Sequence, residues 1–309
     1  MAIPTALRMA SALAWAVTPE YLDVIESIAA GLTDPVAVST SLGKPLENTR
    51  TVEIRDGIAI IPVHSVIFRY ASMFDSISGD SASVQTIAKD FFMALKNPQV
   101  HTIVFDFDSP GGEAKGIAEL AAIIYAARGV KPIKAYVGDL AASAAYWLCV
   151  ACDEVIVHRT ARVGSIGVMT IADVSKNPNK KRFTSTQSPN KNPPADSSKG
   201  EALIQMEIDT LAVMFIDDVA KMRGVSVETV LADFGQGGIL YADDAINVGM
   251  ADRLGSFEEL LKELQQDGVQ TAASMTAVVN RQVMAAFSTS AMTALLGNQI
   301  KIKEITDYD

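Results

Sequence analysis

Short apolar runs that alternate with helical segments constrain the fold of this chain more than any other feature. Five such runs are rich in β-branched residues, as is typical of strands buried on both faces. They are Gly57–Val63, Thr102–Phe107, Ile133–Val137, Glu154–His158 and Ile166–Ile171. Between them, apolar residues recur three and four positions apart at Val84–Leu95, Ala114–Ala127 and Leu140–Ala151. This alternation predicts an α/β fold with a mainly parallel sheet that helices cover.

The ends of the chain differ in composition from this pattern. Residues 1–50 contain a predicted helix, Pro19–Ala30, and a polar stretch, so we expect an N-terminal helical appendage. Residues 51–266 carry the alternating pattern and form the predicted main domain. Residues 267–309 are rich in Thr, Ser, Ala and Met, which favours a flexible C-terminal tail. Inside the main domain, Ser175–Gly200 is polar and contains four prolines and five lysines, which indicates a loop.

Charge and composition exclude several classes of protein. The 309 residues carry a formal net charge of −10, whereas a nucleic-acid-binding protein needs a basic face. No apolar run reaches the roughly 18 residues that span a membrane. Ala10–Val17 is apolar but short and lacks the charged region that precedes a secretion signal. We therefore expect a cytoplasmic protein that is neither secreted nor bound to a membrane.

The two cysteines, Cys149 and Cys152, have the spacing C-x-x-C. A zinc site needs four ligands, and the sequence has no second pair. Two small buried residues one helical turn apart are the simpler interpretation. We expect neither a metal nor an organic cofactor.

Ser143 is a lone hydroxyl between two pairs of alanines. A serine becomes a nucleophile when a base removes its proton. His64, His101 and His158 each lie beside a predicted strand, but no motif connects any of them with Ser143. A lysine is the other possible base, because burial among apolar side chains can lower its pKa by about 3 units. The alanine-lined stretch provides such surroundings.

Two glycine-containing motifs could complete a site around this serine. Asp108–Gly112 reads DSPGG and joins a predicted strand to a predicted helix, where backbone N–H groups can approach a ligand or an oxyanion. Arg162–Val168 reads RVGSIGV, and the hydroxyl of Ser165 could orient a neutral lysine. Taken singly, each motif also fits an ordinary tight turn.

Taken in order, SPGG, the serine among alanines and GSIGV resemble the serine–lysine peptidases typified by signal peptide peptidase A. The similarity is greatest to their phage branch, the head maturation proteases, and covers roughly residues 51–265. It includes Ile58–Ile67, Gln99–Gly112 and Gly238–Ser256. The resemblance implies a ClpP/crotonase-like spiral of ββα units, with active sites assembled in homo-oligomers.

The resemblance also implies roles for individual residues. Ser143 matches the nucleophile, and Ser165 matches the serine that positions the lysine. Gly111 and Gly112 match the oxyanion turn. The base falls in the polar loop, where Lys191 fits the family pattern best.

The lysine assignment has a rival in Lys199, because the loop departs from the family pattern. Ser188 and Pro189 stand where the family has a glycine, and Asn192 stands where it has an acidic residue.

The predicted function is that of a serine endopeptidase with a Ser143/Lys191 dyad. We expect a homo-oligomeric prohead protease in the host cytoplasm that cleaves scaffold, capsid or portal polypeptides. An extended substrate is expected to add as a strand beside the glycine turn. The C-terminal tail would then tether the enzyme to scaffold or be removed by self-cleavage.

Four alternatives remain at this point. A bacterial cytoplasmic peptidase of the same family would have the same site, and an inactive homologue would bind scaffold without cutting it. A ClpP-type peptidase would need a histidine in the region of Arg162–Val168, which contains none. A crotonase-like enzyme could use Glu113 or Asp139, but it leaves Ser143 unexplained.

Overall fold

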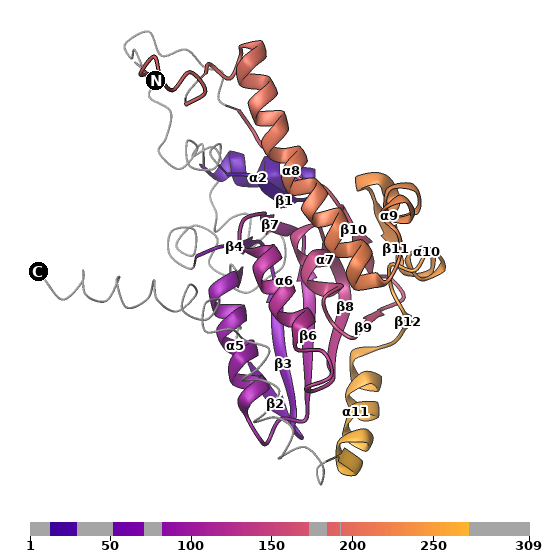
Figure 1. Cartoon of the computed structure of the whole chain (residues 1–309). Helices are drawn as coiled ribbons and strands as arrows, with labels where there is room; N and C mark the ends of the chain where they lie inside the picture. The colour runs from indigo at the N-terminus through magenta and orange to yellow at the C-terminus, as the bar shows by residue number, and fades with distance from the viewer. Residues whose placement is uncertain (1–12, 30–51, 71–81, 173–183, 192, 272–309) are drawn as a thin grey trace, which may run out of the picture.

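The computed structural model describes residues 13–29, 52–70, 82–172, 184–191 and 193–271 (Figure 1). Its larger sheet has eight strands in the order β11-β10-β8-β6-β3-β2, with β9 beside β8 and β12 beside β9. The strands are β2 (Glu53–Arg55), β3 (Ile58–His64), β6 (Thr102–Ser109), β8 (Ile133–Ala142), β9 (Glu154–Val157), β10 (Arg162–Gly164), β11 (Ile239–Tyr241) and β12 (Arg253–Leu254). Among the described strand pairs of this sheet, β2–β3 and β10–β11 are antiparallel and the others are parallel. The expected α/β class with a mainly parallel sheet is therefore confirmed.

Helices cover both faces of the large sheet (Figure 1). The described α-helices are α2 (Pro19–Ala29), α5 (Val84–Lys96), α6 (Ile117–Ala126), α7 (Ala144–Cys149), α8 (Ser198–Arg223), α9 (Val227–Asp233), α10 (Ala242–Asn247) and α11 (Phe257–Thr271). Helices α5, α6 and α7 pack with the sheet into the main apolar cluster, whereas α11 covers the other face through Leu260, Leu261 and Leu264. Burial on two faces explains why the strands read as continuous apolar runs.

A second, smaller sheet lies beside the large one and has the order β1-β7-β4-β5. Its strands are β1 (Trp15–Val17), β4 (Ile67–Phe68), β5 (Ala82–Ser83) and β7 (Gly111–Glu113). The chain repeats one unit here. A long strand of the large sheet leads into one or two short strands of the small sheet and then into a helix, as β3–β4–β5–α5 and again as β6–β7–α6. The expected ββα units are therefore present.

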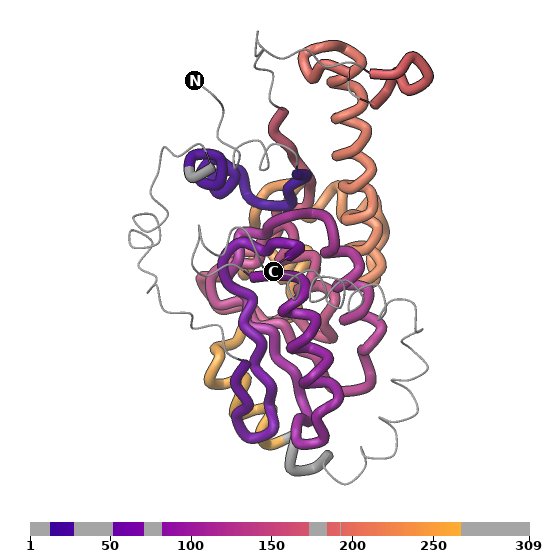
Figure 2. Tube along the Cα trace, turned by 90° about the vertical axis from the view of Figure 1, so that its left-hand side faces the viewer, coloured from indigo at the N-terminus to yellow at the C-terminus, as the bar shows by residue number. Residues whose placement is uncertain are grey.

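Helix α8 projects from the rest of the molecule (Figures 1 and 2). Its first residues follow the Ser197 cap, whose side chain accepts from the Gly200 N–H at 3.1 Å. Phe215, Val219 and Met222 are buried near its C-terminal end, whereas Met206 in its first half and Val213 just past its middle are more than half exposed. The helix is thus packed at its C-terminal end and free of the core at the other.

Two boundaries differ from the sequence predictions. Ile166–Ile171 is not a strand; the strand is β10, and Met169 forms only an isolated bridge with Trp15. Strand β8 continues to Ala142, where the pattern predicted a helix from Leu140, because Leu140–Ala142 pair with β10. Of the polar segment, 175–183 and residue 192 lie outside the described residues, as does 272–309 of the predicted tail. The domain division itself stays a prediction.

Among the described helices, none combines the length and apolar character that a membrane span requires.

Candidate active site

Ser143 lies at the junction of β8 and α7, where the backbone is unusual. Its φ and ψ are 53° and −119°, and such positive-φ conformations cost a non-glycine residue about 1–3 kcal/mol. Its N–H donates to the Gly164 carbonyl at 2.7 Å. Its Oγ lies 3.5 Å from the Gly167 carbonyl oxygen, too far to hold the hydroxyl firmly. The turn therefore fixes the serine backbone and leaves its hydroxyl weakly bonded.

The alanines around Ser143 explain how the sharp turn is possible. The side chains of Ala141, Ala142, Ala144 and Ala145 are completely buried, and so is Ser143. Small side chains let the strand end and the helix start pack against their neighbours without a clash. They also keep water from the serine, which is the environment expected from the sequence.

Helix α7, which begins at the nucleophile candidate, is anchored by its aromatic residues. The Tyr146 hydroxyl donates to the Met250 carbonyl at 3.0 Å. Burial raises the pKa of Tyr146, so this hydroxyl keeps its proton and remains a donor. The Trp147 ring stacks on Phe215 of α8 at 4.4 Å between centroids, and its indole N–H donates to Asp218 at 2.9 Å.

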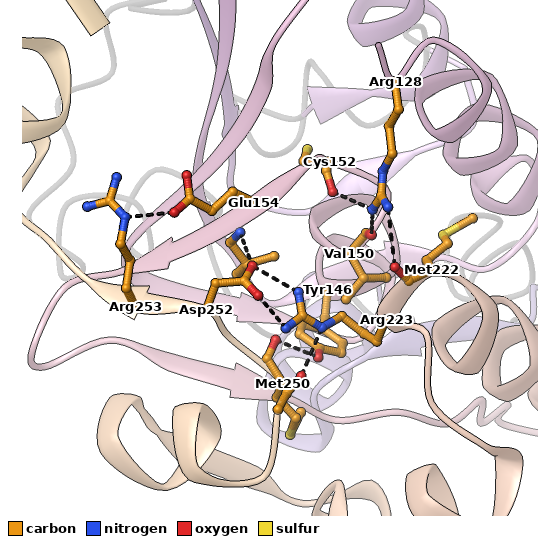
Figure 3. A network of polar contacts seen from close by, with 12 residues as sticks. Arg128, Tyr146, Val150, Cys152, Glu154, Met222, Arg223, Met250, Asp252 and Arg253 are labelled. Carbon is orange, nitrogen blue, oxygen red and sulfur yellow. Dashed lines mark hydrogen bonds and ion pairs between the residues drawn. The ribbon is translucent and has the colours of Figure 1, made fainter. Parts of the chain in front are cut away.

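The opposite end of α7 is held by Arg128 (Figure 3). Its guanidinium donates to the carbonyls of Val150 at 2.7 Å and Ala151 at 3.0 Å, and also to that of Cys152. The last carbonyls of a helix have no partner inside the helix and carry partial negative charge, so a cation stabilises them. The helix that presents Ser143 is thus fixed at both ends.

A second arginine joins the chain segments behind α7 (Figure 3). Arg223 donates to both carboxylate oxygens of Asp252, at 3.0 and 2.8 Å, and to the Gly249 carbonyl at 2.9 Å. Burial alone would raise the pKa of Asp252, but the hydrogen bonds from Arg223 and from the Val155 N–H lower it. This ion pair connects the end of α8 with the segment before β12.

Cys149 and Cys152 lie in the same region as free, buried thiols. Burial raises the pKa of both, which keeps them as unreactive thiols. The interpretation of the C-x-x-C pair as small core residues fits this environment. No group of three metal-ligating side chains comes together in the described ranges.

The glycine turn lies directly against Ser143. A Cβ placed on Gly111, whose φ is +105°, would be 3.0 Å from the Ser143 Cβ and 2.2 Å from the Ala16 carbonyl oxygen. A Cβ on Gly112 would be 1.9 Å from the Ile67 carbonyl oxygen. Real side chains do not make contacts this short, so only glycine lets this backbone approach the serine.

Ser109, which the sequence analysis quoted without a role, supports the glycine turn. Its Oγ donates to the Ser65 carbonyl at 2.6 Å and accepts from the Gly111 N–H at 3.2 Å. The Gly111 N–H is therefore engaged by Ser109 in this arrangement. Its place in the DSPGG motif was the available signal, but a serine in a turn has too many possible partners for its bond to be predicted.

Ser165 lies next to Ser143 through the sheet. Strands β10 and β8 are parallel, with Gly164 opposite Ala142, so each strand is followed immediately by a serine. Ser165 also has a positive φ, 55°, and its N–H donates to the Gly238 carbonyl at 2.7 Å. The structure thus brings together Ser143, Ser165 and Gly111, which the sequence had placed in separate motifs.

The two lysine candidates are not part of this cluster. Lys191 is exposed in the segment before α8, and its N–H donates to the Ser188 carbonyl at 3.1 Å. Lys199 is exposed in the first turn of α8. Both views place this end of α8 away from the sheet (Figures 1 and 2). The lysine of the predicted dyad therefore stays a prediction.

Lys131 is a buried lysine, but it lies at the wrong end of β8 to serve Ser143. Desolvation lowers its pKa to about 8, and its Nζ donates to the carbonyls of Ala94 and Asn97 at 3.0 and 2.7 Å. It precedes the first residue of β8, whereas Ser143 follows the last. A strand of ten residues separates them by roughly 30 Å.

The histidines have other partners. His64 Nε2 lies 3.1 Å from the Asp106 carboxylate. His101 contacts the Thr102 hydroxyl and the Asp56 carbonyl, and His158 contacts Thr160.

The two carboxylates considered for a crotonase-like reaction also have structural partners. Burial raises the pKa of Glu113, which accepts from the Arg69 N–H at 3.1 Å. Asp139 forms an exposed ion pair with Arg162 at 3.5 Å.

A comparison with protein families matches the part of the chain that contains two of the site serines. Residues 126–271 match the model of peptidase family S49. That stretch contains Ser143 and Ser165. The resemblance to signal peptide peptidase A-like serine peptidases is confirmed by this match and by the relatives that follow.

Two relatives come from phages. The chain is 31% identical to the head-tail preconnector protein GP5 of Enterobacteria phage P21 over 216 residues, which are 66% of this chain and 42% of that protein. It is 29% identical to capsid assembly protease C of Escherichia phage lambda, over 66% of this chain and 48% of that protein. A bacterial relative, protease 4 of Salmonella typhi, is 27% identical over 65% of this chain and 33% of that protein. The chain therefore spans less than half the length of each.

Solved structures with a similar arrangement include two kinds of protein. One is a ClpP1 mutant from Listeria monocytogenes, with a TM-score of 0.43 and 11% identity over 65% of this chain and 92% of that chain. The other is an enoyl-CoA hydratase from Shewanella pealeana, with a TM-score of 0.46 and 10% identity over 88% of this chain and 92% of that chain.

Proposed function

We propose that this chain is a serine endopeptidase in which Ser143 is the nucleophile. The observation that carries the proposal is the strained turn at Ser143, buried among alanines and in contact with the glycine turn. Strain of this kind persists only where the surrounding structure enforces it, and it is common at catalytic residues. The family match supports the same reaction.

In the proposed reaction a neutral lysine, Lys191, takes the proton of Ser143 Oγ as the oxygen attacks a peptide carbonyl. Ser165 Oγ positions the lysine amine. A backbone N–H of the glycine turn donates to the oxyanion, and Gly112 suits this better because Ser109 engages the Gly111 N–H. The lysine then gives the proton to the leaving amine, and a water molecule releases the acyl group from the serine. Neither a metal nor an organic cofactor takes part.

We propose further that Lys191 reaches Ser143 from a neighbouring copy of the chain. The outward direction of α8 supports this, and so does the exposure of Met206 and Val213 on it, at 59% and 56%. Exposed apolar side chains on a projecting helix favour a contact between copies. The resemblance to a family with oligomeric sites points the same way.

The proposed substrates are polypeptides of capsid assembly, cut inside a prohead. The names of the two phage relatives, a capsid assembly protease and a head-tail preconnector protein, support this choice. The proposed place of action is the host cytoplasm.

The test compares wild type with Ser143→Ala, Lys191→Ala and Lys199→Ala on an unfolded protein at mildly alkaline pH, read by intact mass. Lys262→Ala, at an exposed lysine of α11, is the matched control. We expect cutting by wild type, Lys199→Ala and Lys262→Ala only. Cutting that survives Lys191→Ala and is lost in Lys199→Ala would move the base to Lys199. Cutting by Ser143→Ala, or none by wild type, would contradict the function.

Mixing two inactive variants tests the contribution of the neighbouring copy. Equal amounts of Ser143→Ala and Lys191→Ala should together recover about a quarter of the wild-type rate, because each site then needs one intact partner of each kind. A mixture that stays inactive after the subunits have exchanged would place both residues of the dyad in the same chain.

A further inference from the structure

The N-terminal strand β1 lies beside the glycine turn and is bound to it through the main chain. It is antiparallel to β7, with Ala16 opposite Gly112. The Thr18 N–H donates to the Pro110 carbonyl at 3.0 Å, and the Ala114 N–H donates to the Ala14 carbonyl at 2.9 Å. Main-chain bonds of an antiparallel ladder recur at every second residue, so the Gly112 N–H faces the Ala16 carbonyl.

The other edge of β1 is bound in the same way. Trp15 and Met169 exchange two main-chain bonds, of 2.7 Å from the Trp15 N–H and 2.8 Å from the Met169 N–H. The Thr170 hydroxyl donates to the Leu13 carbonyl at 2.8 Å. β1 is thus an extended segment held between the glycine turn and the chain after Ser165. Main-chain bonds on both edges hold a peptide in a recognition site independently of its side chains.

The carbonyl group of Ala16 is the part of β1 next to the nucleophile. A Cβ built on Gly111 would touch both the Ala16 oxygen, at 2.2 Å, and the Ser143 Cβ, at 3.0 Å. Only the space of one absent side chain therefore separates the Ala16 carbonyl from the serine. Since β1 is paired with the glycine turn beside the buried Ser143, no other substrate strand can take this position while β1 is in place.

The side chains of β1 and of Ala14, which precedes it, alternate between two environments. Ala14 and Ala16 belong to the main apolar cluster and are 4% and 0% exposed. Trp15 and Val17 point to a separate cluster, where the Trp15 ring packs edge-on against Phe68 at 6.0 Å. The positions on the core side therefore hold alanine-sized side chains, and those on the other side hold large ones.

We propose that β1 occupies the substrate-strand position of this chain and that Ser143 cuts the peptide bond between Ala16 and Val17. This inference rests on the proposed function. It adds a class of substrate, namely an extended peptide with an alanine-sized residue immediately before the cut bond and another two positions earlier. Any other polypeptide has to displace β1 before it can be cut.

The reaction at this bond needs only the groups already described and water. Ser143 Oγ forms a bond to the Ala16 carbonyl carbon, and its proton passes to the lysine amine. The bond from that carbon to the Val17 nitrogen breaks as the lysine returns the proton to the nitrogen. Water then hydrolyses the Ala16 ester, which leaves a carboxylate on Ala16, a free amine on Val17 and Ser143 regenerated.

The experiment follows the full-length chain and an added unfolded protein in the same tube, by intact mass and by labelling of new N-termini. The variants are Ser143→Ala, Ala16→Asp and Val17→Pro. Ala232→Asp, at an exposed alanine of α9, is the matched control for Ala16→Asp. Val17→Pro tests the same bond without a change in the alanine pocket, in case Ala16→Asp disturbs folding.

We expect wild type and Ala232→Asp to gain an N-terminus at Val17 at equal rates, and Ser143→Ala to remain intact. A carboxylate at the buried Ala16 position should slow this cut by about 100-fold, since it is desolvated without a partner. Val17→Pro should also stop it. Cutting of the added protein by wild type with no new N-terminus at Val17 would overturn this inference and leave the proposed function intact. If wild type cuts neither polypeptide, both fail.

Discussion

The two sheets of this molecule are built in different ways. In the large sheet, strands of seven to ten residues such as β3, β6 and β8 are held by apolar side chains buried on both faces. In the small sheet, strands of two or three residues are held by the close approach of backbones at Gly111 and Gly112. Ser143, the proposed nucleophile, lies where the two sheets meet.

This difference implies that the large sheet provides the stability of the fold and the small sheet provides the geometry of the candidate site. The large sheet is stabilised by the volume of its buried side chains, so this sheet tolerates exchange of one apolar residue for another of similar size. In the small sheet a single added Cβ is enough to prevent the close approach of the backbones, because the backbone itself surrounds the site. Substitutions should therefore affect stability in one sheet and activity in the other, and the next three predictions test that division.

The largest effect is expected from one methyl group in the small sheet. Gly112→Ala places a Cβ 1.9 Å from the Ile67 carbonyl oxygen, so β7 has to move away from β4. Loss of a backbone donor to an oxyanion lowers the rate about 100- to 1000-fold, and we expect at least that loss in cutting of an unfolded protein. The control is Gly138→Ala in β8, where the new Cβ would lie 3.5 Å from Tyr136, an ordinary contact. Equal activity of the two variants would mean that the small sheet is no more sensitive to an added Cβ than the large sheet.

The second prediction compares the loss of stability when a buried aromatic residue is removed from each sheet. Phe105→Ala, in β6, should lower the free energy of unfolding by about 4 kcal/mol, because it leaves a cavity in the main cluster. Trp15→Ala should lower it by no more than about 1 kcal/mol, because Trp15 packs in the separate cluster and can open locally.

Urea unfolding followed by circular dichroism measures both variants, and hydrogen exchange locates the change. Trp15→Ala should accelerate exchange of the Met169 amide, which donates to the Trp15 carbonyl, and leave the strands of the large sheet protected. A Trp15→Ala chain as unstable as Phe105→Ala would mean that both sheets unfold as one unit.

The smallest effect concerns the pH dependence of the large sheet. The pKa of Lys131 is about 8 in the folded chain and near 10.5 when the lysine is solvated. Between these values the unfolded chain binds a proton that the folded chain does not, so stability rises with pH across this window. The gain relative to Lys131→Met should be about 3 kcal/mol, measured by urea unfolding from pH 7 to 10.5. Parallel curves for the two chains would contradict the lowered pKa.

The sequence predicted the large sheet well because each of its main strands carries its own signal. Ile58–His64 and Thr102–Ser109 are buried on both faces and read as apolar runs. The end of β8 was missed because alanine favours helices, and only its pairing with β10 makes Leu140–Ala142 a strand. Local composition cannot report such a partner.

The site was predicted in parts rather than as a whole. Ser143, Ser165 and the glycines were predicted from separate motifs, which the structure brings side by side, and their catalytic roles stay predictions. The neighbour on the other side of the glycine turn, Trp15–Val17, was not found, because a three-residue strand bound through its main chain has no side-chain pattern of its own. The lysine could not be placed either, since a polar loop gives no periodic signal.

Helix α8 is held near its C-terminal end, where Phe215 stacks on Trp147. From Phe215 back to Ser198 the helix extends about 25 Å at 1.5 Å per residue. A rotation of about 10° at the stack would therefore move the tip by about 4 Å, more than the length of a hydrogen bond. The packing at Phe215 alone therefore cannot fix the position of the N-terminal end of α8. An atom at that end that has to meet a partner to within a fraction of an ångström needs a second contact to hold it.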